Sequence, residues 1–333
     1  MKLLVPLILL LASCGSAAGS TSFEADGPIS GNILLTGNKG EDTVSLIDLD
    51  SGTELARLET GSQPHEIAIS PDGQRAAVVA YGGTSIDIID VAAAAISQTI
   101  DIAPNSRPHG LLWLVDNRLV ATTEGSDTLT IVDMDDAGVS AMPTGGEGSH
   151  MVAVSPDTSR AYVANMRSGT VSVLELATGA LLATWEAGEM PEGLAVSSDG
   201  TTLWVADRAN ATLFAFDTTS GERIAEIAVG QFPIRVAISP DGATVVTSNL
   251  MSGNLSLIDA ESRTLNRTIP VSSSAGTRQV TILFSDDGRT LYVAETGRNR
   301  IATVDMERGE VVRHYAAGED SDGLGITTIT PAD

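Results

Sequence analysis

Three of the four histidines recur at a nearly constant interval along this 333-residue chain. His65, His109 and His150 are separated by 44 and 41 residues. Pro64 precedes the first and Pro108 the second, and a short apolar run follows each histidine. Neutral imidazole is a ligand for Zn²⁺, Cu²⁺ and Mn²⁺, and it is also the usual general base near neutral pH. If the fold brings these three side chains together, we expect either a divalent metal site or a base beside a binding cavity.

Arginines form a second group of residues that could bind a ligand. They lie in segments that connect the expected strands: Arg107, Arg167, Arg208, Arg235, Arg278, Arg298 and Arg300. Guanidinium groups can hold a carboxylate or phosphate with two parallel hydrogen bonds. Acidic residues such as Glu124 and Asp207 occupy the same segments, so simple pairing on the surface is the alternative interpretation, and the one we favour.

The elements that must position these groups repeat about every 42 residues. A carboxylate closes one apolar run in each repeat, at Asp48, Asp90, Asp133, Glu175, Asp217, Asp259 and Asp305, with intervals of 42, 43, 42, 42, 42 and 46. A second marker is the turn Ser-Pro-Asp-Gly at 70–73 and 239–242, with variants at 155–158, 197–200 and 285–288. Both kinds of carboxylate are interpreted as turn residues that bind nearby backbone groups.

Each repeat contains four short β-rich runs and no sustained helical spacing. In one unit the runs are 67–70, 76–81, 86–90 and 97–102. Four strands in 40–45 residues are typical of a propeller blade. The seventh inner strand, 324–329, has no partners after it, and strands at 32–36, 43–48 and 54–59 complete its blade. We therefore predict an all-β, seven-bladed β-propeller over 29–333, closed by pairing the two ends of the chain.

The repeat places one residue per blade just before the inner strand, at the mouth of the central channel. These positions hold His65, His109, His150, Glu192, Ile234, Val280 and Asp322. Candidate catalytic residues are His109, His150 and Glu192, and the candidate metal ligands are His65, His109 and His150. Candidate ligand-binding residues in the same loops are Arg107, Asn165, Asp207, Arg208, Arg235 and Asn249. The alternative is that Pro-His before an inner strand is a structural element of the repeat.

Charge limits the possible partners. The chain has 43 acidic and 19 basic residues, for a formal net charge of −24 at pH 7. Binding to nucleic acid depends on Lys and Arg displacing counterions from phosphates, so we exclude nucleic acid as a partner. Like charge also discourages self-association, and we expect a monomer.

The amino-terminal residues resemble an export signal. Lys2 precedes an apolar run at 3–11, and the sequence Leu11-Ala-Ser-Cys14 resembles a bacterial lipobox. Nine apolar residues are too few to span a bilayer. Cys14 is the only cysteine, and lipidation would explain a single thiol in an exported protein. We predict a signal peptide at 1–13, lipidation of Cys14, a flexible tether at 14–28, and a location in the periplasm or at the outer membrane.

Several repeats are similar to those of a known propeller family. The sequence Tyr162-Val-Ala-Asn165 after the 155–158 turn resembles the YVTN repeat, as do Val246-Thr-Ser-Asn249 and Tyr292-Val-Ala294. The resemblance covers about 31–333 and implies a YncE-like propeller of the cell envelope. Its broader class includes lactonases and a streptogramin lyase, and it shares no catalytic residue. The resemblance therefore implies fold and compartment rather than activity.

Three functions remain open at this point. In the first, the channel face binds a small molecule, a metal or an envelope protein without obligatory catalysis. In the second, the protein is a lactone hydrolase or lyase that uses a histidine-bound divalent metal, with His109 or His150 as base. In the third, the protein is a scaffold in a larger envelope complex and binds no small ligand.

Overall fold

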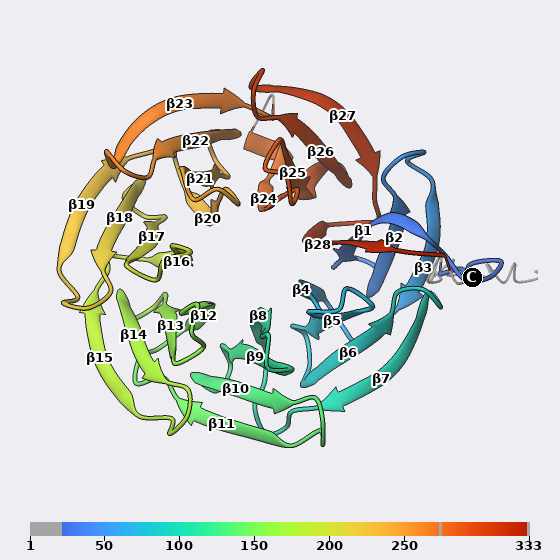
Figure 1. Ribbon diagram of the computed structural model, residues 1–333, viewed down its shortest axis with the longest axis horizontal. Coiled ribbons are helices and arrows are strands. Elements are labelled where there is room, and N and C mark those ends of the chain that lie inside the picture. Colours follow the sequence, from blue (N-terminus) through green and yellow to red (C-terminus); the bar gives the residue numbers. More distant parts are fainter. Residues whose placement is uncertain (1–21, 273–274, 332–333) are drawn as a thin grey trace, which may run out of the picture.

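The computed structural model describes residues 22–272 and 275–331, which form a ring of seven β-sheets around a central channel (Figure 1). Each sheet is a blade of four antiparallel strands, and the strands follow one another from the channel to the outer rim. The predicted seven-bladed, all-β fold is therefore confirmed. The helical elements in the described part are two single 3₁₀ turns, at Ala275–Thr277 and Thr296–Arg298. Neither is long and apolar enough to cross a membrane.

We number the blades in chain order, starting from the first that is continuous in sequence. Blade 1 contains β4 (Pro64–Ile69), β5 (Arg75–Ala80), β6 (Ser85–Asp90) and β7 (Ala95–Asp101). Blade 2 contains β8 (Pro108–Trp113), β9 (Arg118–Thr123), β10 (Thr128–Asp133) and β11 (Val139–Pro143). Blade 3 contains β12 (Ser149–Val154), β13 (Arg160–Asn165), β14 (Thr170–Glu175) and β15 (Leu181–Glu186).

The remaining blades follow the same pattern. Blade 4 contains β16 (Pro191–Val196), β17 (Thr202–Asp207), β18 (Thr212–Asp217) and β19 (Arg223–Ala228). Blade 5 contains β20 (Pro233–Ile238), β21 (Thr244–Asn249), β22 (Asn254–Asp259) and β23 (Thr264–Pro270). Blade 6 contains β24 (Gln279–Phe284), β25 (Thr290–Glu295), β26 (Arg300–Asp305) and β27 (Glu310–Ala316). Blade 7 contains β28 (Ser321–Ile329), β1 (Gly31–Asn38), β2 (Thr43–Asp48) and β3 (Glu54–Glu59).

Blade 7 closes the ring by pairing the two ends of the chain, as predicted. Strand β28 pairs antiparallel with β1, with Ile33 opposite Thr327 and Leu35 opposite Gly325. Just before β1, Phe23 exchanges two backbone hydrogen bonds with Arg57 of β3, at 3.0 and 2.9 Å. The predicted signal peptide and Cys14 lie outside the described residues.

The hydrophobic core consists of layers between neighbouring blades. One layer joins Val79 and Ile88 of blade 1 to Leu119 of blade 2, and all three side chains are almost fully buried. Aromatic side chains thicken other layers: Trp185 of blade 3 stacks on Phe216 of blade 4 with ring centroids 5.7 Å apart. Because every layer needs both neighbours, the ring buries its apolar faces only when it is closed.

The repeated carboxylates stabilise turns, as expected. In the 155–158 turn, the Ser155 hydroxyl donates to Asp157 (2.6 Å) and accepts from the backbone N–H of Arg160 (2.9 Å). Asp259, one of the residues that mark the period, accepts from the backbone N–H of Ser262 at 2.8 Å. These side chains satisfy backbone donors that the strands leave unpaired.

Candidate functional site

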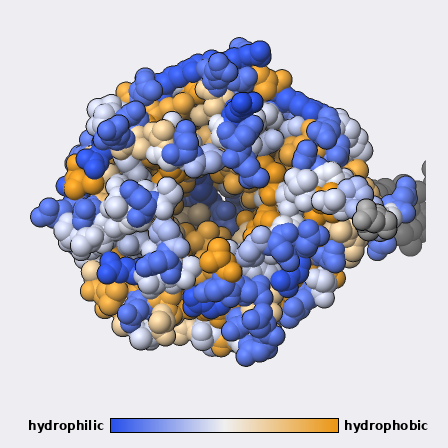
Figure 2. Space-filling view, viewed as in Figure 1, coloured by the Kyte–Doolittle hydropathy of each residue, from blue (hydrophilic) through white to orange (hydrophobic). Residues whose placement is uncertain are grey.

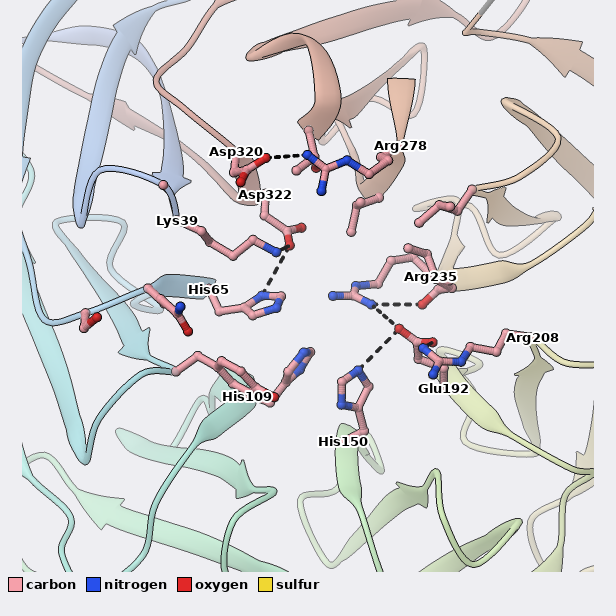
Figure 3. A pocket seen from close by; sticks show the side chains of 18 of the residues that line it. Lys39, His65, His109, His150, Glu192, Arg208, Arg235, Arg278, Asp320 and Asp322 are labelled. Atoms are coloured by element: carbon pink, nitrogen blue, oxygen red, sulfur yellow. Dashed lines mark hydrogen bonds and ion pairs between the residues drawn. The ribbon is translucent and has the colours of Figure 1, made fainter. Parts of the chain in front are cut away.

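The seven inner strands each place their second residue at one mouth of the channel. All seven of these residues line a single cavity there: His65, His109, His150, Glu192, Ile234, Val280 and Asp322. The cavity has a volume of about 690 Å³, within the range of small-molecule sites. Figure 2 shows that the molecule is hollowed at the centre of the ring, and Figure 3 shows the side chains that converge in the cavity.

A bulge in each inner strand explains why two consecutive residues point into the channel. In β4, Pro64 is paired with Ala80 and Ile67 with Val78, so three steps on one strand match two on its neighbour. The same irregularity follows the start of all the other inner strands. A bulge leaves residues unpaired and redirects their side chains. The second residue therefore forms the mouth, and the third residue can enter the channel beneath it.

The three histidines come together as a row of tilted rings, with interplanar angles of 50° between His65 and His109 and 37° between His109 and His150. The ring centroids of His65 and His109 are 4.1 Å apart, and those of His109 and His150 are 3.6 Å apart. Tyr81 packs its ring edge-on against His65 and His109, at 5.5 and 5.6 Å. All three imidazoles are buried.

This arrangement does not fit a metal held by the three imidazoles. Three ligands for one ion must point their lone pairs at a common centre. Here both nitrogens of His150 face Glu124 and Glu192 at 3.5 and 3.3 Å, and Nδ1 of His65 faces Asp322 at 3.6 Å. Within the described ranges, no group of three or more His, Cys, Asp or Glu side chains is arranged to hold a metal ion. Metal binding by His65, His109 and His150 stays a prediction from sequence, and we route no chemical step through a metal.

His150 lies between two carboxylates. Its Nδ1 is 3.5 Å from Glu124 and its Nε2 is 3.3 Å from Glu192. Burial opposes a charged imidazole, but the two carboxylates outweigh burial and raise the pKa of His150. The same contact, together with the Tyr81 hydroxyl that donates to Glu124 at 2.9 Å, lowers the pKa of Glu124 to about 2.

His65 and His109 have the opposite electrostatic environment. Burial lowers the pKa of His65 to about 3, against the attraction of Asp322, whose carboxylate lies 3.6 Å away. Burial also lowers the pKa of His109 to well below its usual value, and the neighbouring imidazoles act in the same direction. Both rings are therefore neutral at pH 7, with a lone pair available to accept a proton.

Arg235, the third residue of β20, lies at the centre of the channel. Its guanidinium donates to Glu66 of blade 1 at 2.6 Å, to Glu192 at 3.4 Å and to the Ile234 carbonyl at 3.0 Å. Glu66 is 169 residues away in the sequence, on the other side of the ring. Arg235 is 5 % exposed, and the carboxylates raise its pKa against the effect of burial. The ion pair therefore bridges the channel beneath the mouth.

The other cations that line the cavity are also paired with carboxylates. Arg208 donates to Glu192 at 2.5 Å, Lys39 donates to Asp322 at 2.5 Å, and Arg278 donates to Asp320 at 2.5 Å. Burial opposes the charge of Glu192, but His150 and the arginines outweigh it and lower its pKa. Pairing of these arginines, the interpretation favoured by the sequence, agrees with the geometry.

The remaining candidate ligand-binding residues do not line the cavity. Arg107 contacts the Tyr81 hydroxyl, and its side chain is 51 % exposed. Asn165 is fully buried and donates to Thr170 and Ser172 of its own blade. Asn249 likewise donates to two residues of its own blade, Asn254 and Ser256. Asp207 accepts hydrogen bonds from the backbone N–H groups of Glu189 and Met190. These three side chains hold loops in place.

Sequence reasoning missed several residues of the cavity and its surroundings. Lys39 and Tyr81 line the cavity, and Glu66 supports it from the channel below. A signal for Glu66 was present, because it directly follows His65 as Arg235 directly follows Ile234. Aligning the third residue of each inner strand would have brought these two opposite charges into one column. Tyr81 and Lys39 each directly follow the second strand of their blade, the position that Arg208 and Leu250 hold in blades 4 and 5, so the period also carried a signal for them.

Fold and site together define a seven-bladed β-propeller with a polar cavity at one channel mouth. The chain belongs to the family described as lactonase, seven-bladed β-propeller, whose model matches residues 37–284. No curated protein sequence matches it significantly. The finer YVTN-repeat resemblance stays a prediction.

Solved structures with similar folds have little sequence in common with this chain. A functionally unknown protein from Desulfotomaculum acetoxidans DSM 771 has a TM-score of 0.77 at 15 % identity, covering 90 % of this chain and 100 % of its own. Kuenenia stuttgartiensis hydrazine synthase has a TM-score of 0.70 at 16 % identity, with coverages of 81 % and 96 %. Dihydro-heme d1 dehydrogenase NirN in complex with DHE has a TM-score of 0.65 at 15 % identity, with coverages of 91 % and 76 %. These similarities concern the fold alone.

Proposed function

We propose that the protein binds a small molecule in the cavity at the channel mouth. The observation that carries this proposal is the convergence of one side chain from each of the seven blades on one cavity of about 690 Å³. Such a pocket combines a rigid frame with a few polar groups in fixed positions, which is the usual design of a ligand site.

The test is to block the cavity from one inner strand. In the Ile234→Trp variant, an indole from β20 would occupy the cavity, and Ile224→Trp on the outer strand β19 is the matched control. We expect compounds that raise the melting temperature of the wild type to lose this effect in Ile234→Trp and keep it in Ile224→Trp. Equal responses of both variants, checked for folding by circular dichroism, would place binding elsewhere.

A second candidate function is opening of a lactone ring by water, which the family match favours. In this reaction water attacks the ester carbonyl while the neutral imidazole of His109 accepts the proton of that water; the ring C–O bond then breaks, and the imidazolium of His109 returns the proton to the leaving alkoxide. Burial lowers the pKa of His109, which favours this return of the proton. His150, whose two nitrogens face Glu124 and Glu192 and whose pKa is raised, places positive charge near the oxygen that gains negative charge. Of the candidate catalytic residues, Glu192 thus acts on His150 and would not touch the substrate.

Catalysis is tested with a panel of lactones and two histidine variants. Loss of a general base lowers turnover by roughly 10²–10⁴-fold, so we expect His109→Gln to show such a loss. His314→Gln, in the outer strand β27, should retain wild-type turnover. Turnover that depends on an added divalent metal would instead support the metal-dependent version of the reaction. Absence of turnover on every lactone would leave the protein as a binding module.

For location, we propose attachment to an envelope membrane through lipid on Cys14, with the propeller facing the periplasm or the outer surface. The support is the lipobox-like sequence at 11–14. Mass spectrometry of the amino-terminal peptide should show an acylated cysteine, and Cys14→Ser should release the protein from membranes. An unmodified Cys14 in membrane-free protein would contradict this proposal.

A further inference from the structure

We propose that the ligand of the channel-mouth cavity is an uncharged molecule with one apolar face, and that the cavity rejects carboxylates and phosphates. This inference rests on the proposed binding function and adds the chemical class of the ligand. It follows from three features of the described residues: the pairing of every cation in the cavity lining, the balance of charge there, and the arrangement of apolar and imidazole side chains on opposite arcs.

Apart from His150, which lies between Glu124 and Glu192, the charges that line the cavity are equal in number. Four cations, Lys39, Arg208, Arg235 and Arg278, stand against four carboxylates, Asp42, Glu192, Asp320 and Asp322. Glu66 and Glu124 lie directly behind the lining and add negative charge on two sides of it. An entering anion therefore meets no excess of positive charge.

Each cation already has a carboxylate partner within hydrogen-bond distance. The separations are 2.5 Å for Lys39, Arg208 and Arg278 and 2.6 Å for Arg235. An anionic ligand could bind one of these groups only by displacing its carboxylate, which would then face the ligand with like charge. Breaking a buried pair in this way is unfavourable, because the displaced charge loses its compensation.

The net charge of the whole molecule also disfavours the binding of anions. At −24, its field repels anions as they approach, although salt screens this effect beyond about 10 Å at 0.1 M ionic strength. A cationic ligand is attracted by this field, but Asp322, Glu192 and Asp320 are already held by Lys39, Arg208 and Arg278, so the ligand would have to displace one of these cations. An uncharged ligand displaces neither kind of group.

The apolar side chains of the mouth gather on one arc. Blades 5 and 6 contribute Ile234 and Val280, and Leu250 extends this surface from the loop after β21. The same blades also contribute Arg235 and Arg278, which are held by carboxylates. In a ring of seven blades, blade 2 lies opposite blades 5 and 6, and it contributes His109, the middle one of the three imidazoles (Figures 1 and 3). A ligand that spans the cavity therefore contacts hydrocarbon beside paired arginines on one side and hydrogen-bonding imidazole on the other.

The first experiment compares ligands that differ in charge. The probes are γ-butyrolactone-γ-carboxylate, its methyl ester and a trimethylammonium-substituted counterpart, measured by isothermal titration calorimetry on the full folded protein. We expect the ester to bind at least about tenfold more tightly than either ion. If the carboxylate binds as tightly as the ester and Ile234→Trp abolishes both, the binding function stands and the inference on charge is wrong.

The second experiment does not need the correct ligand. Asp320→Asn removes the partner of Arg278 at the half-exposed rim, where loss of the pair should not disturb folding, and Glu66→Gln does the same for the buried Arg235. We expect acetate and inorganic phosphate to leave the melting temperature of the wild type unchanged and to raise that of Asp320→Asn. Specific binding of either anion in the wild-type cavity, lost in Ile234→Trp, would overturn the inference. So would a response of Asp320→Asn no greater than that of the wild type. If no lactone binds, lactones are not ligands of this cavity. The measurements with acetate and phosphate still show whether the cavity rejects anions.

Discussion

The two ends of the channel differ in how closely the seven blades resemble one another. At the opposite rim, the turns at 70–73, 155–158, 197–200, 239–242 and 285–288 all use a serine hydroxyl that donates to an aspartate two residues later. At the channel mouth, one equivalent position holds histidine, glutamate, aspartate, isoleucine or valine, depending on the blade. The blades are uniform where the fold needs the same turn each time, and they differ where the side chains face a shared cavity. In a repeat protein, such departures from the repeat are the better guide to function.

The largest expected effect is the loss of stability when a buried ion pair at the mouth is broken. The comparison is an exposed ion pair at the opposite rim. Arg235→Ala leaves Glu66 buried without its hydrogen-bond donor, so we expect a loss of roughly 3–5 kcal/mol in the free energy of unfolding. Arg289, whose side chain is 87 % exposed and lies 3.9 Å from Asp287, is the matched control. Arg289→Ala should change stability by less than about 1 kcal/mol. Urea denaturation of both variants measures the difference, and similar losses would contradict the account of the buried network.

The second prediction concerns the pH dependence of stability. His65 and His109 are neutral when folded, and their imidazoles regain a pKa near 6.5 when the chain unfolds. The unfolded chain therefore binds more protons below pH 6.5, and stability falls as the pH falls, by up to about 1.4 kcal/mol per pH unit for each histidine. Between pH 4.5 and 6.5, His65→Asn should have a shallower slope by about one proton.

His150 behaves in the opposite way. Its pKa is raised in the folded state, so both folded and unfolded forms are protonated well below pH 6.5. Its stabilising contribution is complete there and is lost as the pH rises through its folded pKa. Because His150 also lowers the pKa of Glu124 and of Glu192, His150→Asn would change the protonation of both carboxylates, and His65→Asn is the variant that tests the slope. A slope that is the same in the wild type and in His65→Asn would show that His65 is not held neutral.

The smallest expected effect concerns the turns of the opposite rim. Ser155→Ala removes the hydrogen bonds to Asp157 and from the Arg160 backbone, and we expect a loss of about 1 kcal/mol in stability. Ligand affinity should stay unchanged, because this turn lies at the far end of the channel from the cavity. Calorimetry with any compound that binds the wild type checks this, and weaker binding by Ser155→Ala would contradict the separation of roles.

The sequence predicted the fold well because the period is marked in every blade. The carboxylate at the end of each third strand and the turn after five of the inner strands predicted the number of blades. The unpartnered strand at 324–329 predicted closure by the two chain ends. The same period located the seven mouth positions, because a regular ring places equivalent residues at equivalent depth.

The chemistry of the cavity was harder to predict, because it depends on contacts across the ring. The Arg235–Glu66 pair joins blades 5 and 1; aligning the repeats puts both residues at the third position of their inner strands, but it does not show that they pair. The orientation of the imidazoles also depends on the bulges and on Tyr81, which packs against two of them. Periodicity therefore predicted that the histidines meet, and it could not predict the tilt of their rings.

A crystal structure of the protein soaked with the methyl ester of γ-butyrolactone-γ-carboxylate tests the central claim most directly. We expect the ester at the channel mouth, with its apolar side against Ile234 and Val280 and its carbonyl toward the imidazole of His109. An ester bound outside the ring, with the mouth empty of it, would contradict the assignment of this cavity as the binding site.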